Sequence, residues 1–95
     1  MTITLYDIFR TPLQVRIIEE LLNRPNEYFT VSRMAKLLNA SPSAVSSRVE
    51  NLKKIGILKF ISGSEKAKIF SLNKNHPVSR ILADFYKKLL SINEH

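Results

Sequence analysis

The side chains best suited to recognition chemistry follow the pair Ser41-Pro42, which is typical of a helix start. Ser43, Ser46 and Ser47 fall within five positions, and Arg48 comes directly after them. Serine is a mediocre helix former, so three serines on one short stretch are unusual on propensity alone. Short hydroxyl side chains let the start of a helix approach base edges in the DNA major groove. The stretch therefore predicts a DNA contact, and the alternative is an ordinary solvated helix face.

Catalytic and metal-binding chemistry find little support in the same sequence. The chain has no cysteine, which excludes thiolate zinc sites, disulfides and cysteine nucleophiles. Its two histidines, His76 and His95, have no partner at ligand spacing, and two glycines cannot form a glycine-rich phosphate loop. We therefore expect no catalytic residue, no metal and no cofactor, and an enzyme is the most remote alternative.

The positive charge is concentrated in the middle of the chain. The formal net charge is +7, from 15 basic and 8 acidic residues. Residues 30–68 hold eight basic against two acidic side chains, a net of +6. A localised positive field raises the local concentration of a polyanion such as DNA. The alternative is a protein that is basic throughout.

Size and composition predict one domain over residues 1–95, because 95 residues with 44% hydrophobic content suit a single core. The apolar runs are far shorter than the roughly 20 residues needed to cross a bilayer, and the start of the chain does not resemble a signal peptide. We expect a soluble cytoplasmic protein that does not bind a membrane.

Hydrophobic spacing and helix-start residues predict the elements before the serine-rich stretch. Residues 2–9 suggest a short helix, and a second helix starts at Thr11-Pro12 and ends within residues 23–26. Residues 27–30 suit a small strand. A further helix runs from near Thr30 to Leu38, and its predicted buried residues are Val31, Met34, Ala35, Leu37 and Leu38.

The serine-rich stretch itself is predicted to lie on a helix from Pro42 to Ile55. Its core face is Val45, Val49 and Leu52, which fall within about 60° of one another at ~100° per residue. Gly56 suits the left-handed position that follows a helix. Residues 57–61 and 68–72 flank a loop and predict an antiparallel hairpin. Residues 77–92 then predict an amphipathic helix with an apolar stripe.

Three segments resemble winged helix-turn-helix regulators of the ArsR and MarR types: residues 11–18 (TPLQVRII), 29–38 (FTVSRMAKLL) and 41–58 (SPSAVSSRVENLKKIGIL). The resemblance spans residues 11–72 and implies an α+β, mostly α fold, a winged helix-turn-helix with a two-stranded wing and a C-terminal dimerisation helix. The cysteine or paired-histidine motifs by which ArsR-type proteins sense metals have no counterpart here.

Within this fold, we expect the recognition helix to read the major groove and the basic wing to rest on phosphates or in the minor groove. Asn51 could pair with adenine, Arg48 suits phosphate or guanine, and Lys53 is a phosphate contact. Glu50 would repel the DNA backbone. The predicted DNA-binding residues are Arg33, Lys36, Ser41, Ser43, Ser46, Ser47, Arg48, Asn51, Lys54, Lys59, Gly63, Lys66 and Lys68.

The final helix predicts a homodimer, because five large apolar side chains on it would leave an exposed patch on a small monomer. The alternative is a helix that packs back on its own core. The predicted interface residues are Leu5, Ile8, Phe9, Val78, Ile81, Leu82, Phe85, Tyr86, Leu89 and Ile92.

These observations favour a dimeric, sequence-specific regulator of transcription that binds double-stranded DNA. A repressor is expected, because the predicted elements leave no segment for an activation domain, and the sequence does not indicate an effector. The alternatives are a winged-helix protein–protein module of a transcription or replication complex, and a sequence-neutral, chromatin-like DNA binder.

Overall fold

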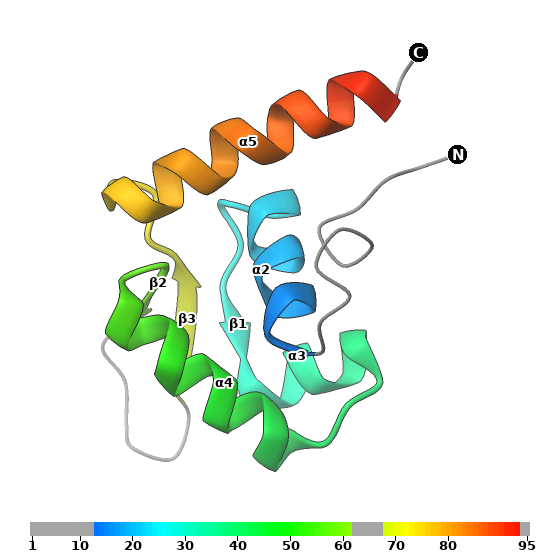
Figure 1. The fold of residues 1–95 in the computed structure, drawn as a ribbon. Coiled ribbons are helices and arrows are strands. Elements are labelled where there is room, and N and C mark those ends of the chain that lie inside the picture. The colour runs from blue at the N-terminus through cyan, green and yellow to red at the C-terminus, as the bar shows by residue number, and fades with distance from the viewer. Residues whose placement is uncertain (1–12, 62–67, 94–95) are drawn as a thin grey trace.

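The fold comprises four helices and a three-stranded sheet, seen in a computed structural model that describes residues 13–61 and 68–93 (Figure 1). The predicted helix over residues 2–9, the Thr11-Pro12 start and the loop glycine Gly63 lie outside the described residues. The elements are, in chain order, α2 (Leu13–Asn23), β1 (Phe29–Thr30), α3 (Val31–Leu38), α4 (Pro42–Ile55), β2 (Leu58–Ile61), β3 (Ile69–Leu72) and α5 (Pro77–Asn93).

Capping residues fix the ends of α3 and α4. The Thr30 hydroxyl accepts a hydrogen bond from the Arg33 amide at 3.1 Å, and the Ser41 hydroxyl accepts one from the Ala44 amide at 3.3 Å. Each bond satisfies an amide that the first helical turn leaves free. Asn39 ends α3 and Gly56 ends α4 in the left-handed region, with φ values of 52° and 100°. The predicted helix, short turn and helix are confirmed.

The sheet is antiparallel, with strand order β1-β3-β2. The hairpin of β2 and β3 is confirmed, with Leu58 opposite Leu72 and Phe60 opposite Phe70. The strand predicted at 27–30 narrows to Phe29–Thr30, and it joins β3 in the same sheet. The rings of Phe29 and Phe70 stack with centroids 6.1 Å apart, which ties β1 to the hairpin.

The core lies between the inner sides of α2, α3 and α4 and the inner face of the sheet. Ile17, Met34, Val45 and Phe70 have no exposed surface, and full burial of such a side chain contributes roughly 1.5–3 kcal/mol. The predicted core face of α4 is confirmed. The prediction was wrong for Leu37, which is 41% exposed, because it lies about 100° around the short helix from the centre of its buried side.

The α5 helix lies at the end of the molecule opposite the start of α4 (Figure 1). Tyr86 and Leu89 are buried and pack against α2 residues that include Val15 and Ile18. The Tyr86 hydroxyl donates a hydrogen bond to Asn23 Oδ1 at 2.9 Å, and burial raises the pKa of this phenol. No helix among residues 13–61 and 68–93 has the length and apolarity to cross a membrane.

Packing of α5 on its own chain already covers part of the predicted interface. Tyr86 and Leu89 belong to the core of this chain, because the helix turns them toward α2. Val78 and Leu82 are half-buried against the main core. The other stripe residues, Ile81, Phe85 and Ile92, stay exposed by 68%, 42% and 63%. The predicted contributors Leu5, Ile8 and Phe9 lie outside the described residues.

Candidate nucleic-acid interface

The start of α4 presents short polar side chains to solvent. Ser43, Ser46, Ser47 and Arg48 are all exposed, while Val45 between them is fully buried. No carboxylate lies in the first turn of this helix. Ser41 is also exposed, but its hydroxyl already accepts the capping hydrogen bond. This part of α4 therefore offers hydroxyl groups and one guanidinium to an approaching partner.

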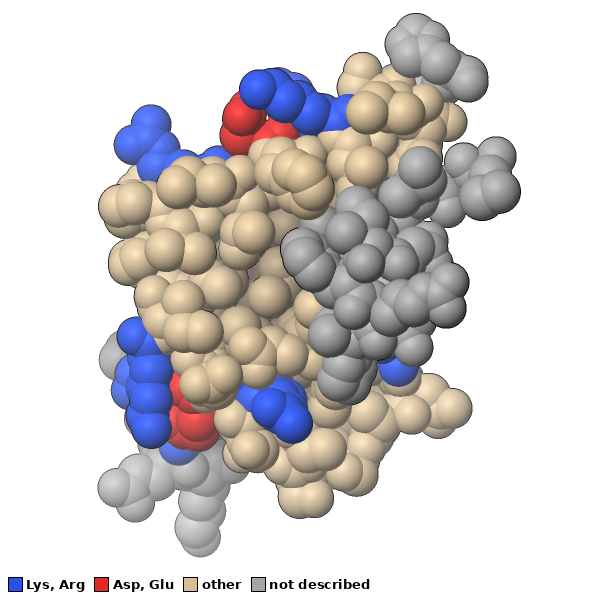
Figure 2. Space-filling view, in the orientation of Figure 1, with Lys and Arg blue, Asp and Glu red and all other residues tan. Residues whose placement is uncertain are grey.

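The second half of α4 carries a charge pair with the wing. Glu50 accepts a hydrogen bond from Lys68 Nζ at 2.7 Å, and this bond lowers the pKa of the Glu50 carboxyl. Lys68 Nζ also lies 5.4 Å from the centroid of the Phe60 ring, and Lys53 Nζ lies 4.6 Å from it. Figure 2 shows acidic and basic atoms side by side at the lower left, near the end of α4. Glu50, expected to repel DNA, is thus neutralised within the chain.

Asn51, predicted to reach the groove floor, points toward a neighbouring helix in the free chain. Its amide donates a hydrogen bond to Gln14 Oε1 on α2 at 3.1 Å. The side of α4 that carries Asn51 packs close to α2, which provides the nearest acceptor. In the free chain Asn51 therefore links α4 to α2, and its reading of adenine stays a prediction.

Arg33 is likewise held by contacts within its own chain, and its phosphate contact stays a prediction. Its guanidinium donates to Glu27 Oε1 and to the Tyr28 carbonyl, each at 2.7 Å, and stacks 4.7 Å over the Phe29 ring. The hydrogen bond from Arg33 lowers the pKa of Glu27. These partners surround Arg33 because β1 runs directly into α3. The sequence showed that Glu27 precedes Arg33 by six residues, but it did not show the bend of the chain that brings the two side chains together.

The remaining predicted cations are divided between two faces. Lys36, Arg48 and Lys54 are exposed and have no ion-pair partner among the described residues. Lys59 alternates with the inward-facing Leu58 and Phe60 on β2, so it projects from the outer face of the sheet. Lys66 lies outside the described residues.

Two positioning residues escaped the sequence reasoning. Gln14 accepts the hydrogen bond from Asn51 of α4. The Phe60 ring contacts the ammonium groups of Lys53, on α4, and of Lys68. The only sign of the role of Phe60 in the sequence was its place next to a lysine in the predicted hairpin.

Within residues 13–61 and 68–93, no cluster of three or more His, Cys, Asp or Glu side chains is arranged to hold a metal ion.

Solved structures with this arrangement are winged-helix regulators. A double mutant of ZitR from Lactococcus lactis in its apo form is 25% identical, with a TM-score of 0.60 over 81% of this chain. The heme sensor protein PefR from Streptococcus agalactiae, with heme bound, is 18% identical, with a TM-score of 0.63 over 82% of the chain. The chain has the winged helix-turn-helix fold of MarR-type regulators. This confirms the predicted resemblance and fold class.

A third structure extends the same likeness. The adhesin competence repressor AdcR from Streptococcus pyogenes is 19% identical, with a TM-score of 0.61 over 80% of this winged-helix chain. The matches span 61% of the ZitR chain, 52% of the PefR chain and 56% of the AdcR chain. Neither a protein-family model nor a curated protein matches the sequence.

Proposed function

We propose that this winged-helix protein is a sequence-specific regulator of transcription that binds double-stranded DNA through α4. The observation that carries the proposal is the exposed, carboxylate-free start of α4 with Ser43, Ser46, Ser47 and Arg48. In winged helix-turn-helix proteins, this end of the second helix of the motif faces the base edges.

The side chains at the start of α4 can contact DNA bases, but each of them alone discriminates between bases only to a limited extent. A serine hydroxyl can donate or accept, so it discriminates bases weakly by itself. Arg48 can contact guanine in bidentate fashion or bind a phosphate. Specificity would therefore come from Arg48 together with the close approach that small side chains allow.

Cations around α4 supply the sequence-independent part of the affinity. Lys36 and Lys54 have no ion-pair partner among the described residues and are free to bind phosphates. Lys68 is paired with Glu50, but both side chains are more than 40% exposed. Such exposed pairs contribute little, about 0–1 kcal/mol, so Lys68 can exchange its carboxylate for a phosphate when DNA arrives.

A second copy of this chain is the partner proposed for the exposed side of α5. Ile81, Phe85 and Ile92 fall within about 40° on the helix wheel, next to the stripe that packs on α2. Adjacent apolar residues of this size usually mark an interface. A two-fold dimer would bind half-sites about one helical turn apart. The likeness to AdcR, itself a repressor, supports repression.

Salt dependence tests the proposal. Four phosphate contacts per protomer, from Lys36, Lys53, Lys54 and Lys68, predict a loss of affinity between about 50 and 200 mM salt of about a hundredfold for each protomer. A dimer that binds two half-sites should therefore lose about ten-thousandfold. Fluorescence anisotropy with matched and scrambled duplexes measures it. Arg48→Gln should reduce the preference for the matched duplex, whereas Lys87→Gln, on the exposed side of α5, should change nothing.

Each alternative has its own outcome in this experiment. Equal affinity for matched and scrambled duplexes at all salt concentrations would indicate a sequence-neutral binder. No salt-dependent binding of either duplex would contradict the proposal and favour the protein–protein module. The two results are distinguishable because only the first retains the salt response.

A further inference from the structure

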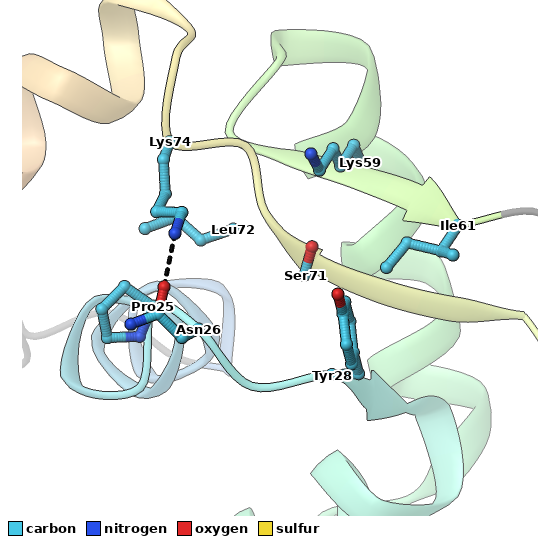
Figure 3. A pocket seen from close by; sticks show the side chains of 8 residues that line it. All are labelled: Pro25, Asn26, Tyr28, Lys59, Ile61, Ser71, Leu72 and Lys74. Atoms are coloured by element: carbon cyan, nitrogen blue, oxygen red, sulfur yellow. Dashed lines mark hydrogen bonds between the residues drawn. The ribbon is translucent and has the colours of Figure 1, made fainter.

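The outer face of the three-stranded sheet carries a hollow that the proposed DNA contacts do not use. Its volume is about 460 Å³, and the residues that line it come from both wing strands, from the segment after β3 and from the turn between α2 and β1 (Figure 3). The inner face of the same sheet packs on the helices through the core. The hollow therefore lies on the other side of the sheet from α4.

The shape of the hollow follows from the register of the strands. Lys59 lies directly opposite Ser71, and the register of β1 with β3, continued by one residue, places Tyr28 on the other side of Ser71. A small serine thus stands between two long side chains in one row across the sheet. The row spans about 10 Å, because neighbouring strands lie about 4.8 Å apart. This width fits one side chain of a docked segment, between Tyr28 and Lys59.

The floor of the hollow is a buried hydroxyl that lacks a partner within the described chain. Ser71 is only 5% exposed, and its side chain makes no hydrogen bond with any described residue. Buried polar groups in native proteins are almost always hydrogen-bonded, so this hydroxyl points to a partner from outside the chain. A hydroxyl can donate to a carboxylate, and such charge-assisted hydrogen bonds are stronger than neutral ones.

The charged groups that line the hollow are cations. Lys59 and Lys74 line it, and no carboxylate does. Lys59 has no ion-pair partner among the described residues, and the Lys74 ammonium donates to the neutral side chain of Asn26 (Figure 3). An acidic partner is complementary to this surface.

The rest of the outer face favours an acidic protein segment over a nucleic acid. The next row across the sheet consists of Ile61, Ile69 and Thr30, none of which is charged. A nucleic-acid strand is held by a groove whose cations track its backbone. A protein segment needs fewer charges and gains from apolar contacts, which Ile61 and the 62% exposed ring of Tyr28 supply.

We propose that the hollow is a docking site for an acidic segment of a partner protein, in which carboxylates flank an aliphatic side chain. The carboxylates pair with Lys59 and Lys74, and one of them accepts a hydrogen bond from Ser71. The aliphatic side chain packs on Tyr28 and Ile61. The site uses none of the side chains of the proposed DNA contacts.

The test uses the whole chain and three synthetic peptides. The probe is acetyl-Glu-Asp-Leu-Asp-Glu-amide, the uncharged control is acetyl-Gln-Asn-Leu-Asn-Gln-amide, and acetyl-Glu-Asp-Ser-Asp-Glu-amide lacks the aliphatic side chain. Titration followed by two-dimensional amide NMR should give saturable shifts at residues 28, 59, 61 and 71 with the probe. The uncharged control should bind about tenfold more weakly because it forms no ion pairs. The serine peptide should bind about fivefold more weakly because it buries less apolar surface.

Variants separate the contacts from one another. Lys59→Gln should weaken binding of the probe about fivefold, and Lys87→Gln, a matched change on the exposed side of α5, should leave it unchanged. Tyr28→Ala should weaken the probe more than the serine peptide, because the ring contacts the leucine. Ser71→Ala should weaken the probe several-fold without lowering the melting temperature of the free protein, since the hydroxyl that it removes has no partner there.

Several results would overturn the proposal. These are an absence of saturable shifts at the four residues, equal binding of the probe and its uncharged control, and equal effects of Lys59→Gln and Lys87→Gln. A lower melting temperature of Ser71→Ala would also contradict it, because the hydroxyl would then stabilise the fold.

A single-stranded oligothymidylate tests the other class of polyanion. Tighter binding of this strand than of the probe, with shifts at the same four residues, would assign the surface to a nucleic acid and overturn the peptide proposal. Failure of the docking site would leave the DNA proposal for α4 intact, because duplex binding is measured without the peptides.

Discussion

Replacing Gly56 with alanine should destabilise the junction between α4 and α5. Gly56 ends α4 at φ 100°, a backbone conformation that costs a residue with a Cβ about 1–2 kcal/mol. A Cβ placed there would also lie 2.3 Å from His76 Nε2, inside van der Waals contact. The imidazole therefore has to move when the methyl group is present.

Movement of His76 has a cost of its own. His76 Nδ1 accepts a hydrogen bond from the Val78 amide at 3.2 Å, in the first turn of α5. Losing this bond costs about 0.5–1.5 kcal/mol. Together with the backbone term, Gly56→Ala should lower the free energy of unfolding by about 2–3 kcal/mol, a large part of the stability of a small domain.

Urea unfolding of five proteins measures this effect: the unchanged chain, Gly56→Ala, His76→Ala, the double variant and a control. His76→Ala loses the hydrogen bond but makes room, so the double variant should be more stable than the sum of the single effects predicts, by about 1 kcal/mol. Asn39→Ala is the matched control, since Asn39 also has a positive φ of 52°. It should cost about 1 kcal/mol, less than Gly56→Ala. A loss below 1 kcal/mol at Gly56, or additive effects in the double variant, would refute the reasoning.

Three further changes test other parts of the account. Ile81→Ser with Phe85→Ser should shift the protein from dimer to monomer in analytical ultracentrifugation, whereas Ala83→Ser on the same helix should not; a dimer that persists would place the interface elsewhere. Glu50→Gln should tighten DNA binding several-fold at low salt with little change in the salt slope, because Lys68 no longer has to leave a carboxylate before it binds the same phosphate; weaker binding would show that the ion pair is needed to hold the wing. Arg33 and Lys68 lower the pKa values of Glu27 and Glu50 below the ordinary 4.5, so the stability from these pairs is present above that pH and is lost as the pH falls through the folded values. Urea midpoints measured from neutral to acidic pH should therefore fall less steeply for the Glu27→Gln, Glu50→Gln double variant, and an unchanged acid slope would show that these pairs contribute nothing.

Local sequence signals were sufficient to predict most of the fold. Ser41-Pro42 marks the start of α4 and Gly56 marks its end. Both could be predicted because capping depends on nearest neighbours and on a conformation that glycine adopts freely. The core face of α4 followed from helical periodicity. The third strand was harder, since two residues at Phe29–Thr30 carry little pattern and depend on pairing with β3, some 40 residues later.

Side-chain partners across the fold could not be predicted in the same way. Asn51 lies next to Gln14 only because α4 packs on α2, a contact between residues 37 positions apart. Arg33 and Lys59 were counted as phosphate contacts from their charge alone, yet one is held by Glu27 and the other projects from the outer sheet face. Composition shows how many cations a chain has, whereas their free or paired state depends on tertiary structure.

The most direct test of the central claim is a map of amide NMR shifts on adding a specific duplex. The proposed function predicts that the largest shifts fall on residues 43–48 at the start of α4, with smaller ones at Lys54 and Lys68. Shifts centred on the outer sheet face or on the exposed side of α5, with residues 43–48 unaffected, would contradict it.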